Sequence, residues 1–470
     1  MRRGQIRQGI IHTAIAATAL FQLGMVASAQ GPKYVLVDLG TNTSAVGIND
    51  SGQVAGTFVN PDGVRAFRTA PNSKINPTTD DLGPGVVAGI NKFGQVAGST
   101  DKGPFRTAPN SPINPATDNL GTAGSFAITV VTALNDSGQV VGYGFTGGGH
   151  GEARAFRTAP NSPINPALDL LGTLAGRFTW GYAINNSGQV TGVSDLVDSG
   201  SPFFNILVEH AFRTDAAPTN PVLHDLGTLG GSSSVGYGIN NSGQVVGASS
   251  TGSSNLSWHA FRTAANSPIH PSTDDLGTLG GSSTARAIND SGQVVGDSFT
   301  SDARQHAFVY TNGMMYDLNQ LIPSGSGWEL AEAVDINTSG QIVANGQGHA
   351  FRLDPVVIKV SIEIKAHTSP VTINPKSSGK IPVAVLSAPT FDATVRVDRK
   401  TLTFGRAGGE ESLAFCTAPE DVNHDGLLDL VCHFDTDRTG FQSGDTRAVL
   451  KARTLDGIAI EGRALVRIIQ

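Results

Sequence analysis

The stretch "EDVNHDGLLDLVCHF" at residues 420–434 places oxygen-bearing side chains at alternate positions, and this is a pattern that can bind a metal ion. Hard oxygen donors at this spacing fit Ca²⁺, and Gly426 permits the sharp turn between them. An EF-hand would need Glu at the twelfth position, where Cys432 stands, so the β-type exit "LVCHF" favours a short hairpin form of calcium loop. The alternative is an Asx-rich turn without a metal. The predicted ligands are Asp421, Asn423, Asp425, the carbonyl of Leu427, and Asp429.

A second stretch with Asp, Ser and Gly together, "INDSGQVVG" at residues 288–296, recurs along most of the chain. One reaction does not need seven copies, so we interpret each copy as a hairpin turn. The Asn bonds its own backbone, and the Gly three residues later adopts positive φ. The glutamines of the seven copies are 42 to 55 residues apart: Gln53, Gln95, Gln139, Gln189, Gln244, Gln293 and Gln341.

Two further repeated elements, an "AFR" strand and a "DLG" strand, keep phase with these hairpins. Each unit therefore predicts four strands in the order a ("AIN"), b ("QVVG"), c ("HAFRT") and d ("DLG"). A period of 42 to 55 residues is in the range of propeller blades and is too variable for a tightly stacked solenoid. The segment 34–40, "YVLVDLG", is a d strand that precedes the first unit, so it can pair with the last unit and close a ring. We predict an all-β chain in which residues 30–353 form a seven-bladed β-propeller.

The strand order assigns the loops to two faces of the propeller. The a–b turns and the repetitive c–d loops share one face, and the more variable b–c and d–a loops share the other. Binding residues tend to lie on variable loops, so we expect a ligand site on the second face. Aromatic rings and an Arg there would suit a sugar or a peptide, whereas packing between blades is the alternative role. The candidate ligand-binding residues are Trp180, Tyr182, Phe203, Phe204, Tyr237, Arg286 and Asp335.

Four c strands begin with His, and six contain the pair "FR". A ring of metal-binding histidines is conceivable, but the other blades carry Arg65, Gly103 and Arg154 at the same place. We therefore expect these histidines to bond a neighbouring strand or the Asp of "DLG", and the "FR" arginines to pair with Asp residues in the same structural way.

The repeat stops after Leu353, and residues 354–470 predict a β-sandwich that contains the calcium loop. Residues 1–29 predict a signal peptide, with a basic start, an apolar stretch and "ASA" before the cleavage site. Export implies an oxidising compartment, so we expect the only two cysteines, Cys416 and Cys432, to form a disulfide. No later stretch is apolar enough to span a membrane.

Removing residues 1–29 moves the formal net charge from −7 to −10, which argues against nucleic acid as a partner. The unit "DLGTLGGSSS…AIN…SGQVVG…HAFRT" resembles the HAF-repeat family of bacterial extracellular proteins over residues 34–353. That resemblance implies an exported propeller and carries no activity with it. Residues 354–470 resemble a C-terminal module of secreted bacterial proteins, which implies a Ca²⁺-stabilised accessory domain, although the module usually has Gly at the position of His424.

The familiar nucleophile, zinc-helix and phosphate-loop motifs do not occur in the sequence. Our main hypothesis is an exported, monomeric, non-enzymatic protein whose propeller binds an extracellular glycan or protein. The second hypothesis is an extracellular glycan-acting hydrolase or lyase with its site in the propeller funnel and Asp335 or Arg286 involved. The fold alone does not decide between them, because propellers support both.

Overall fold

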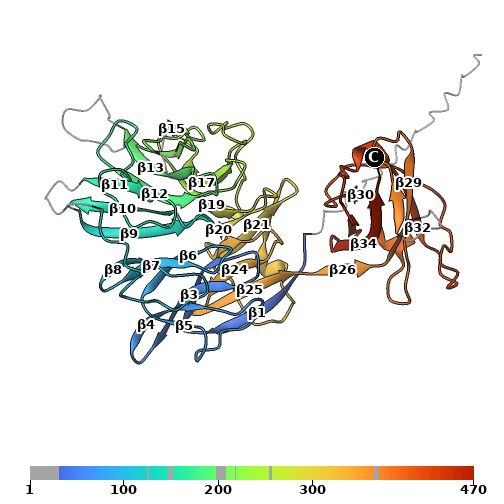
Figure 1. Cartoon of the computed structure of the whole chain (residues 1–470), viewed down its shortest axis with the longest axis horizontal. Coiled ribbons are helices and arrows are strands. Elements are labelled where there is room, and N and C mark those ends of the chain that lie inside the picture. Colours follow the sequence, from blue (N-terminus) through green and yellow to red (C-terminus); the bar gives the residue numbers. More distant parts are fainter. Residues whose placement is uncertain are drawn as a thin grey trace, which may run out of the picture.

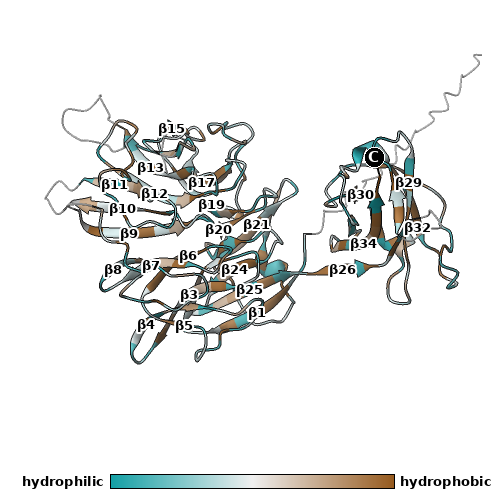
Figure 2. Cartoon of the chain, viewed as in Figure 1, coloured by the Kyte–Doolittle hydropathy of each residue, from teal (hydrophilic) through white to brown (hydrophobic). Residues whose placement is uncertain are grey.

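A computed structural model of the chain describes residues 31–123, 126–146, 152–196, 208–217, 219–252, 257–364 and 370–469. The predicted signal peptide, Phe203 and Phe204 lie outside these residues. The described residues are almost entirely β, and hydrophobic residues concentrate on the strands while the connections are mostly hydrophilic (Figures 1 and 2). The predicted β-propeller fold is confirmed. Among the described residues, no helix is both long and apolar enough to cross a membrane.

Among the described residues, seven small antiparallel sheets make up the propeller, and each begins with one of the predicted hairpins. The seventh sheet combines three strands from the end of the repeat with β1 from its beginning, in a register that pairs Tyr34 with Pro355. The predicted closing strand is therefore confirmed. The sheets are β2 (Thr43–Ile48), β3 (Val54–Asn60), β4 (Gly63–Arg68) and β5 (Asp81–Pro84); β6 (Val86–Ile90), β7 (Val96–Thr100) and β8 (Gly103–Arg106); β9 (Phe126–Leu134), β10 (Val140–Thr146) and β11 (Ala153–Arg157); β12 (Thr179–Ile184), β13 (Val190–Leu196), β14 (Val208–Thr214) and β15 (Leu223–Asp225); β16 (Ser234–Ile239), β17 (Val245–Ser250) and β18 (Trp258–Arg262); β19 (Gly280–Ile288), β20 (Val294–Thr300), β21 (Gln305–Thr311) and β22 (Met314–Asp317); and β23 (Glu332–Ile336), β24 (Ile342–Gly346), β25 (His349–Pro355) and β1 (Tyr34–Thr41).

The predicted d strand is reduced to a single bridge in the second, third and fifth sheets. The bridging residue is Asn119 in the second sheet and Asp275 in the fifth. In each case its side-chain oxygen accepts the backbone N–H of the Gly two residues later, Gly121 or Gly277. That Gly has positive φ, a conformation that glycine adopts readily. A short helical turn, η1 (Leu318–Gln320), follows the complete d strand of the sixth sheet.

The hairpin turns have the predicted chemistry. Asn49 Oδ1 accepts the backbone N–H groups of Ser51 and Gln53, and Gly52 has a φ of 77°. The same Asn also links the blades, because its side-chain N–H donates to the backbone carbonyl of Asn91 in the next blade. Seven such bonds of 3.0 to 3.2 Å form a closed ring, with donors Asn49, Asn91, Asn135, Asn185, Asn240, Asn289 and Asn337.

The backbone N–H of Asn72, in a c–d loop, donates to the carbonyl of Gly52, in an a–b turn, at 3.0 Å. The two kinds of connection therefore share one face, as predicted, and we call it the turn face. The opposite face, which carries the b–c and d–a connections, is the loop face.

The c-strand histidines bond the Asp of "DLG" as predicted, at 2.8 to 2.9 Å. The prediction for the "FR" arginines is wrong for four of the six, Arg68, Arg106, Arg213 and Arg262. Their guanidinium groups donate to backbone carbonyls of the following blade, as Arg68 does to Gly94 and Arg106 does to Gly138. Arg352 does pair with a carboxylate, that of Asp354. The histidine links are His210–Asp225, His259–Asp275, His306–Asp317 and His349–Asp38.

Strand β26 leads out of the propeller into a second group of strands, which form two sheets around one apolar core (Figure 1). Phe404 and Phe434, from opposite sheets, lie in that core with ring centroids 5.0 Å apart. We call the sheet that contains β33 and β34 the outer sheet. It consists of β26 (Val357–Val360), β34 (Ala459–Ile468), β33 (Arg447–Thr454) and β30 (Val397–Gly405), with β28 (Val371–Ile373) beside β34; the other sheet consists of β27 (Ile362–Ile364), β29 (Lys380–Val385), β32 (Leu430–Asp435) and β31 (Leu413–Cys416), and the helical turns are α1 (Ala393–Arg396) and η2 (Thr436–Arg438).

Candidate functional site

Four aromatic rings from three adjacent blades form a continuous series, which we call the aromatic arc: Tyr143, Trp180, Tyr182 and Tyr237. Tyr143 on β10 lies 5.8 Å from the ring of Trp180 and 6.4 Å from that of Tyr182. Tyr182 in turn lies 5.5 Å from Tyr237 on β16. Trp180, Tyr182 and Tyr237 are half-buried, so each ring packs on a neighbour and still has accessible surface. Three of the predicted ligand-binding residues are thus brought together.

Arg286 continues this series into the sixth blade. Its Nε lies 2.8 Å from Asp297 Oδ1, and its Nη2 lies 3.4 Å from Glu332 Oε2 of the seventh blade. Burial lowers the pKa of Arg286, but Asp297 and Glu332 outweigh it and raise the pKa above the ordinary value. Arg286 is therefore a fixed cation that two carboxylates already neutralise.

A repeated backbone feature explains why Tyr182, Tyr237 and Arg286 occupy equivalent positions in their blades. Most innermost strands have a register shift, a β-bulge, three residues before the ring Asn. A bulge leaves one residue unpaired and redirects its side chain. Tyr182, Tyr237 and Arg286 are the bulged residues of three consecutive blades, whereas the first and second blades have Val46 and Ala88 there.

Two carboxylates next to the aromatic arc were not among the predicted site residues. Glu209 on β14 is directly opposite Asp195 on β13. Asp195 is buried and accepts the backbone N–H groups of Arg177 and Phe178 at 2.9 and 2.7 Å. Burial, followed by the charge of Asp195, raises the pKa of Glu209. Burial also raises the pKa of Tyr182, with contributions from Tyr237, Tyr143 and Glu209.

The sequence held a usable signal for Tyr143 and Asp297. Both residues directly follow the "VVG" of a b strand, where other blades have small or aliphatic residues such as Ser99 and Ala248. Side chains at this position face the innermost strand of the next blade, as the contact between Tyr143 and Trp180 shows. Glu209 and Asp195 had no comparable signal, because they begin and end strands whose connection varies from blade to blade.

Asp335 lies apart from the aromatic arc. It lines a cavity of about 220 Å³ at the turn-face end of the channel, together with the ring asparagines and the Ile or Leu that precedes each of them. Its carboxylate accepts the backbone N–H groups of Ile48 and Ile336 at 2.9 and 2.8 Å. Burial raises the pKa of Asp335 to about 6. Asp335 of the seventh blade therefore links that blade to the first blade through its bond to the backbone N–H of Ile48.

The predicted calcium loop is an exposed turn with dense internal hydrogen bonds. The backbone N–H of Asp425 lies 3.1 Å from Asp421 Oδ1 and 3.2 Å from Asn423 Oδ1, so these three residues are close together. Gly426 donates to Asp421 Oδ2, and both His424 and Gly426 have positive φ. The donors Asp421, Asn423 and Asp425 are of the type that Ca²⁺ prefers.

Asp429 differs from the other predicted calcium ligands. It is fully buried, and its two oxygens accept the backbone N–H groups of Val422 and Ser387 at 2.9 and 2.8 Å. Within the described part of the chain, no group of three or more His, Cys, Asp or Glu side chains is arranged to hold a metal. The calcium site stays a prediction, with Asp421, Asn423 and Asp425 as its better-placed ligands.

The predicted disulfide between Cys416 and Cys432 is confirmed. The two cysteines are directly opposite on β31 and β32. The bond therefore closes the segment that contains the predicted calcium loop.

No protein-family model matches the chain, and no curated protein matches it. Among solved structures, the chain is similar to the β-propeller domain of the Trilobed protease from Pyrococcus furiosus, at 8% identity and a TM-score of 0.46, over 68% of this chain and 94% of that one. It is also similar to XC5397, a gluconolactonase from Xanthomonas campestris, at 11% identity and a TM-score of 0.33, over 70% and 92% of the two chains. A third is streptogramin B lyase, at 11% identity and a TM-score of 0.34, over 69% and 98%. Similarities at this level assign no activity to this chain.

Proposed function

We propose that the propeller is a non-enzymatic binding platform and that the aromatic arc on its inner strands is the binding site for an extracellular glycan. The observation that carries this proposal is the series of ring contacts from Tyr143 through Tyr182 to Tyr237 across three blades. Half-buried aromatic rings are held rigidly by packing and offer apolar faces with polar tips, which suits sugar rings. An acceptor for sugar hydroxyl groups lies beside them in the half-buried Glu209.

The charge of the site favours a neutral glycan over an anionic one. Arg286 is engaged by Asp297 and Glu332, so it has little positive charge to offer a ligand. Glu209 and Asp195 add further acidic groups. A carboxylate or sulfate on the ligand would meet net negative charge here, whereas neutral hydroxyl groups would donate to these oxygens.

A glycan array on the full chain, followed by titration of the strongest hits, tests the proposal. We expect Trp180→Ala and Tyr237→Ala to weaken binding of a neutral glycan at least tenfold. The matched control is Phe93→Ala, which removes a half-exposed aromatic ring from the turn face and should bind as the unsubstituted protein does. Equal binding by all three variants would refute the assignment of the site.

One observation favours the second hypothesis, a glycan-acting hydrolase. Glu209 has a raised pKa and lies opposite Asp195, whose carboxylate is fixed by backbone N–H groups, and such unlike carboxylate pairs serve as acid and base. If the bound glycans are cleaved, Glu209→Gln should abolish product formation and leave binding largely intact. Binding without any product would support the binding platform.

We further propose that the protein is exported. The predicted signal peptide at residues 1–29 and the disulfide Cys416–Cys432 support this, because disulfides persist mainly in oxidising compartments. Fractionation of a bacterial host, with sequencing of the N-terminus, tests it. We expect a chain beginning at Gln30 outside the cytoplasm.

A further inference from the structure

The outer sheet carries a concentration of positive charge on the face directed away from its apolar core. On β33, Ala448, Leu450 and Ala452 point into the core, so the alternate residues point outward. On β34, Ile460 and Val466 point inward, which places its basic residues on the same outward face. We call this surface the basic face, and it consists of Lys359, Arg447, Lys451, Arg453, Arg463 and Arg467.

The strand register shows how closely these cations are spaced. Arg463 is paired with Val449, and therefore lies diagonally between Arg447 and Lys451 on the neighbouring strand. Diagonal neighbours on adjacent strands are about 7 to 8 Å apart. Lys451, Arg463, Arg447 and Arg467 thus form a zigzag of positive charge along the two strands.

Little negative charge balances this zigzag. Glu461 is the one acid on the outward face of β33 and β34, and it is already bound by Lys359 at 2.9 Å and by Arg463 at 2.7 Å. Like charges that face one another on a sheet are destabilising. The contrast with the whole chain is clear, because the chain has a formal net charge of −7.

Protection against aggregation does not explain the basic face. Proteins place lysines on edge strands to prevent pairing with other chains. Here β33 and β34 are the central strands in the order β26–β34–β33–β30, and their backbones are already paired on both sides. On a solvated face that binds no ligand, alternating acids and bases would avoid the repulsion between like charges.

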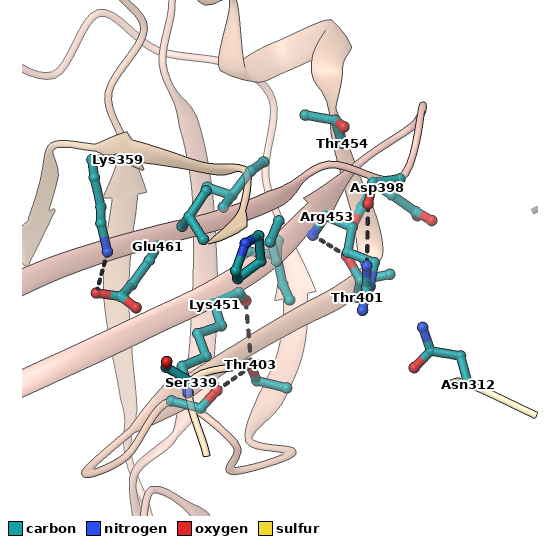
Figure 3. Close-up of a pocket in the computed structure, with 18 of the residues that line it drawn as sticks. Asn312, Ser339, Lys359, Asp398, Thr401, Thr403, Lys451, Arg453, Thr454 and Glu461 are labelled. Atoms are coloured by element: carbon teal, nitrogen blue, oxygen red, sulfur yellow. Dashed lines mark hydrogen bonds and ion pairs between the residues drawn. The ribbon is translucent and has the colours of Figure 1, made fainter. Parts of the chain in front are cut away.

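Part of the basic face, without Arg447 and Arg467, forms one wall of a cleft of about 1580 Å³ against the turn face of the propeller (Figure 3). Lys359, Lys451 and Arg453 line it on the side of the second group of strands, together with the carboxylates of Asp398, Glu411 and Glu461. The propeller contributes neutral amide and hydroxyl groups and two carboxylates, Asp50, which accepts from Thr338, and Asp354, which is paired with Arg352. The neutral groups are Asn72, Asn312, Thr338, Ser339 and Gln341.

We propose that the basic face binds an anionic polysaccharide, one that carries carboxylate or sulfate groups along its length. Arg and Lys side chains at short, regular intervals suit such repeated anionic groups. The amide and hydroxyl groups across the cleft suit the sugar hydroxyls between them. A single-stranded nucleic acid is a poorer fit, because the outward faces of β33 and β34 have no aromatic side chain on which bases could stack.

This proposal is independent of the aromatic arc, which favours neutral glycans. The test measures binding of the full chain to polygalacturonate, to chondroitin sulfate and to neutral dextran at low ionic strength. Two double variants each remove half of the zigzag's positive charges. The first combines Lys451→Gln with Arg463→Gln, and the second combines Arg447→Gln with Arg467→Gln. The control replaces three exposed lysines elsewhere, Lys74, Lys102 and Lys376, by Gln.

We expect the anionic polymers to bind and dextran not to compete with them. Each double variant should weaken binding at least tenfold, the control should change it less than twofold, and added salt should weaken it steeply. Absence of binding to both anionic polymers would overturn the proposal, as would equal binding by the control and the double variants. Tighter binding of a single-stranded oligonucleotide, lost in the same double variants, would overturn the choice of polysaccharide.

Discussion

The side-chain N–H of Asn337 donates to the backbone carbonyl of Asn49 at 3.1 Å, although 288 residues separate the two in the chain. This bond joins the last blade to the first and completes the ring of seven asparagines. Within its own hairpin, Asn337 also donates its side-chain N–H to Gln341 Oε1, and its Oδ1 accepts the backbone N–H of Gln341. The residue that forms each turn therefore also fixes the distance between neighbouring blades.

Replacing one ring Asn should cost far more stability than replacing its neighbour. Asn240→Ala removes the partners of the buried carbonyl of Asn289 and of the part-buried backbone N–H of Gln244, so we expect the free energy of unfolding to fall by about 2 to 4 kcal/mol. Asn241→Ala, at the exposed adjacent position, should cost less than about 1 kcal/mol. Denaturant titration of both variants measures the difference, and equal costs would contradict a structural ring.

The fold could be predicted because its determinants are local and repeated. An Asn, a Gly three residues later and flanking Val or Ile specify a hairpin, and seven copies with a spare d strand specify closure. The His–Asp links were also predictable, since both partners are side chains. The contacts of arginines such as Arg68 were not, because backbone carbonyls leave no trace in a sequence.

The candidate site was harder to predict because it depends on register. Tyr182, Tyr237 and Arg286 precede the ring Asn by three residues, and Asp335 precedes it by two. A shift of one residue along a strand directs the side chain to a different surface. Nothing in the sequence marks the bulge that separates these two positions. The sequence therefore predicts Asp335 in the same site as Tyr182, Tyr237 and Arg286, whereas in the structure it lies apart from them.

Asp335 should make stability depend on pH near 6. Its pKa is raised by burial to about 6, with the charge of Asp50 acting in the same direction, so the folded protein holds the proton that the unfolded chain loses. The stability contributed by this proton is fully present below about pH 4 and is lost as the pH rises through 6.

We expect the free energy of unfolding of the unsubstituted protein to fall by about 1 to 2 kcal/mol from pH 5 to pH 7.5 relative to Asp335→Asn. Parallel denaturant titrations at several pH values measure this difference. Asp290→Asn, at the exposed rim of the same channel, serves as the control and should run parallel to the unsubstituted protein. A constant difference between Asp335→Asn and the unsubstituted protein would rule out the assignment.

Loss of the disulfide should destabilise the second group of strands and leave the propeller unaffected. Cys416 and Cys432 are 16 positions apart, and a cross-link of this length contributes about 3 kcal/mol in a chain-entropy model. We expect Cys416→Ala with Cys432→Ala to lower one of two calorimetric transitions. A reductant should lower the same transition of the unsubstituted protein and change nothing further in the double variant.

Calcium should stabilise the second group of strands through Asp421, Asn423 and Asp425. The metal binds the folded loop and not the unfolded chain, so Ca²⁺ at a hundred times its dissociation constant adds about 2.7 kcal/mol. The full chain is first treated with EDTA, and Ca²⁺ is then added in excess. We expect calorimetry to show that Ca²⁺ raises the temperature of the same transition that the disulfide affects. Asp425→Asn should abolish this response, and because the amide oxygen can still accept the backbone N–H of Leu427, the EDTA-treated variant should stay close to the EDTA-treated unsubstituted protein.

Asp429→Asn separates metal binding from structure at this loop. Because the carboxylate of Asp429 holds the backbone N–H groups of Val422 and Ser387, this variant should lower the transition with or without Ca²⁺. Asp437→Asn, an exposed acid outside the loop, should behave as the unsubstituted protein in both conditions. If Ca²⁺ fails to shift the transition of the unsubstituted protein, the loop is an Asx-rich turn that its own hydrogen bonds hold in place.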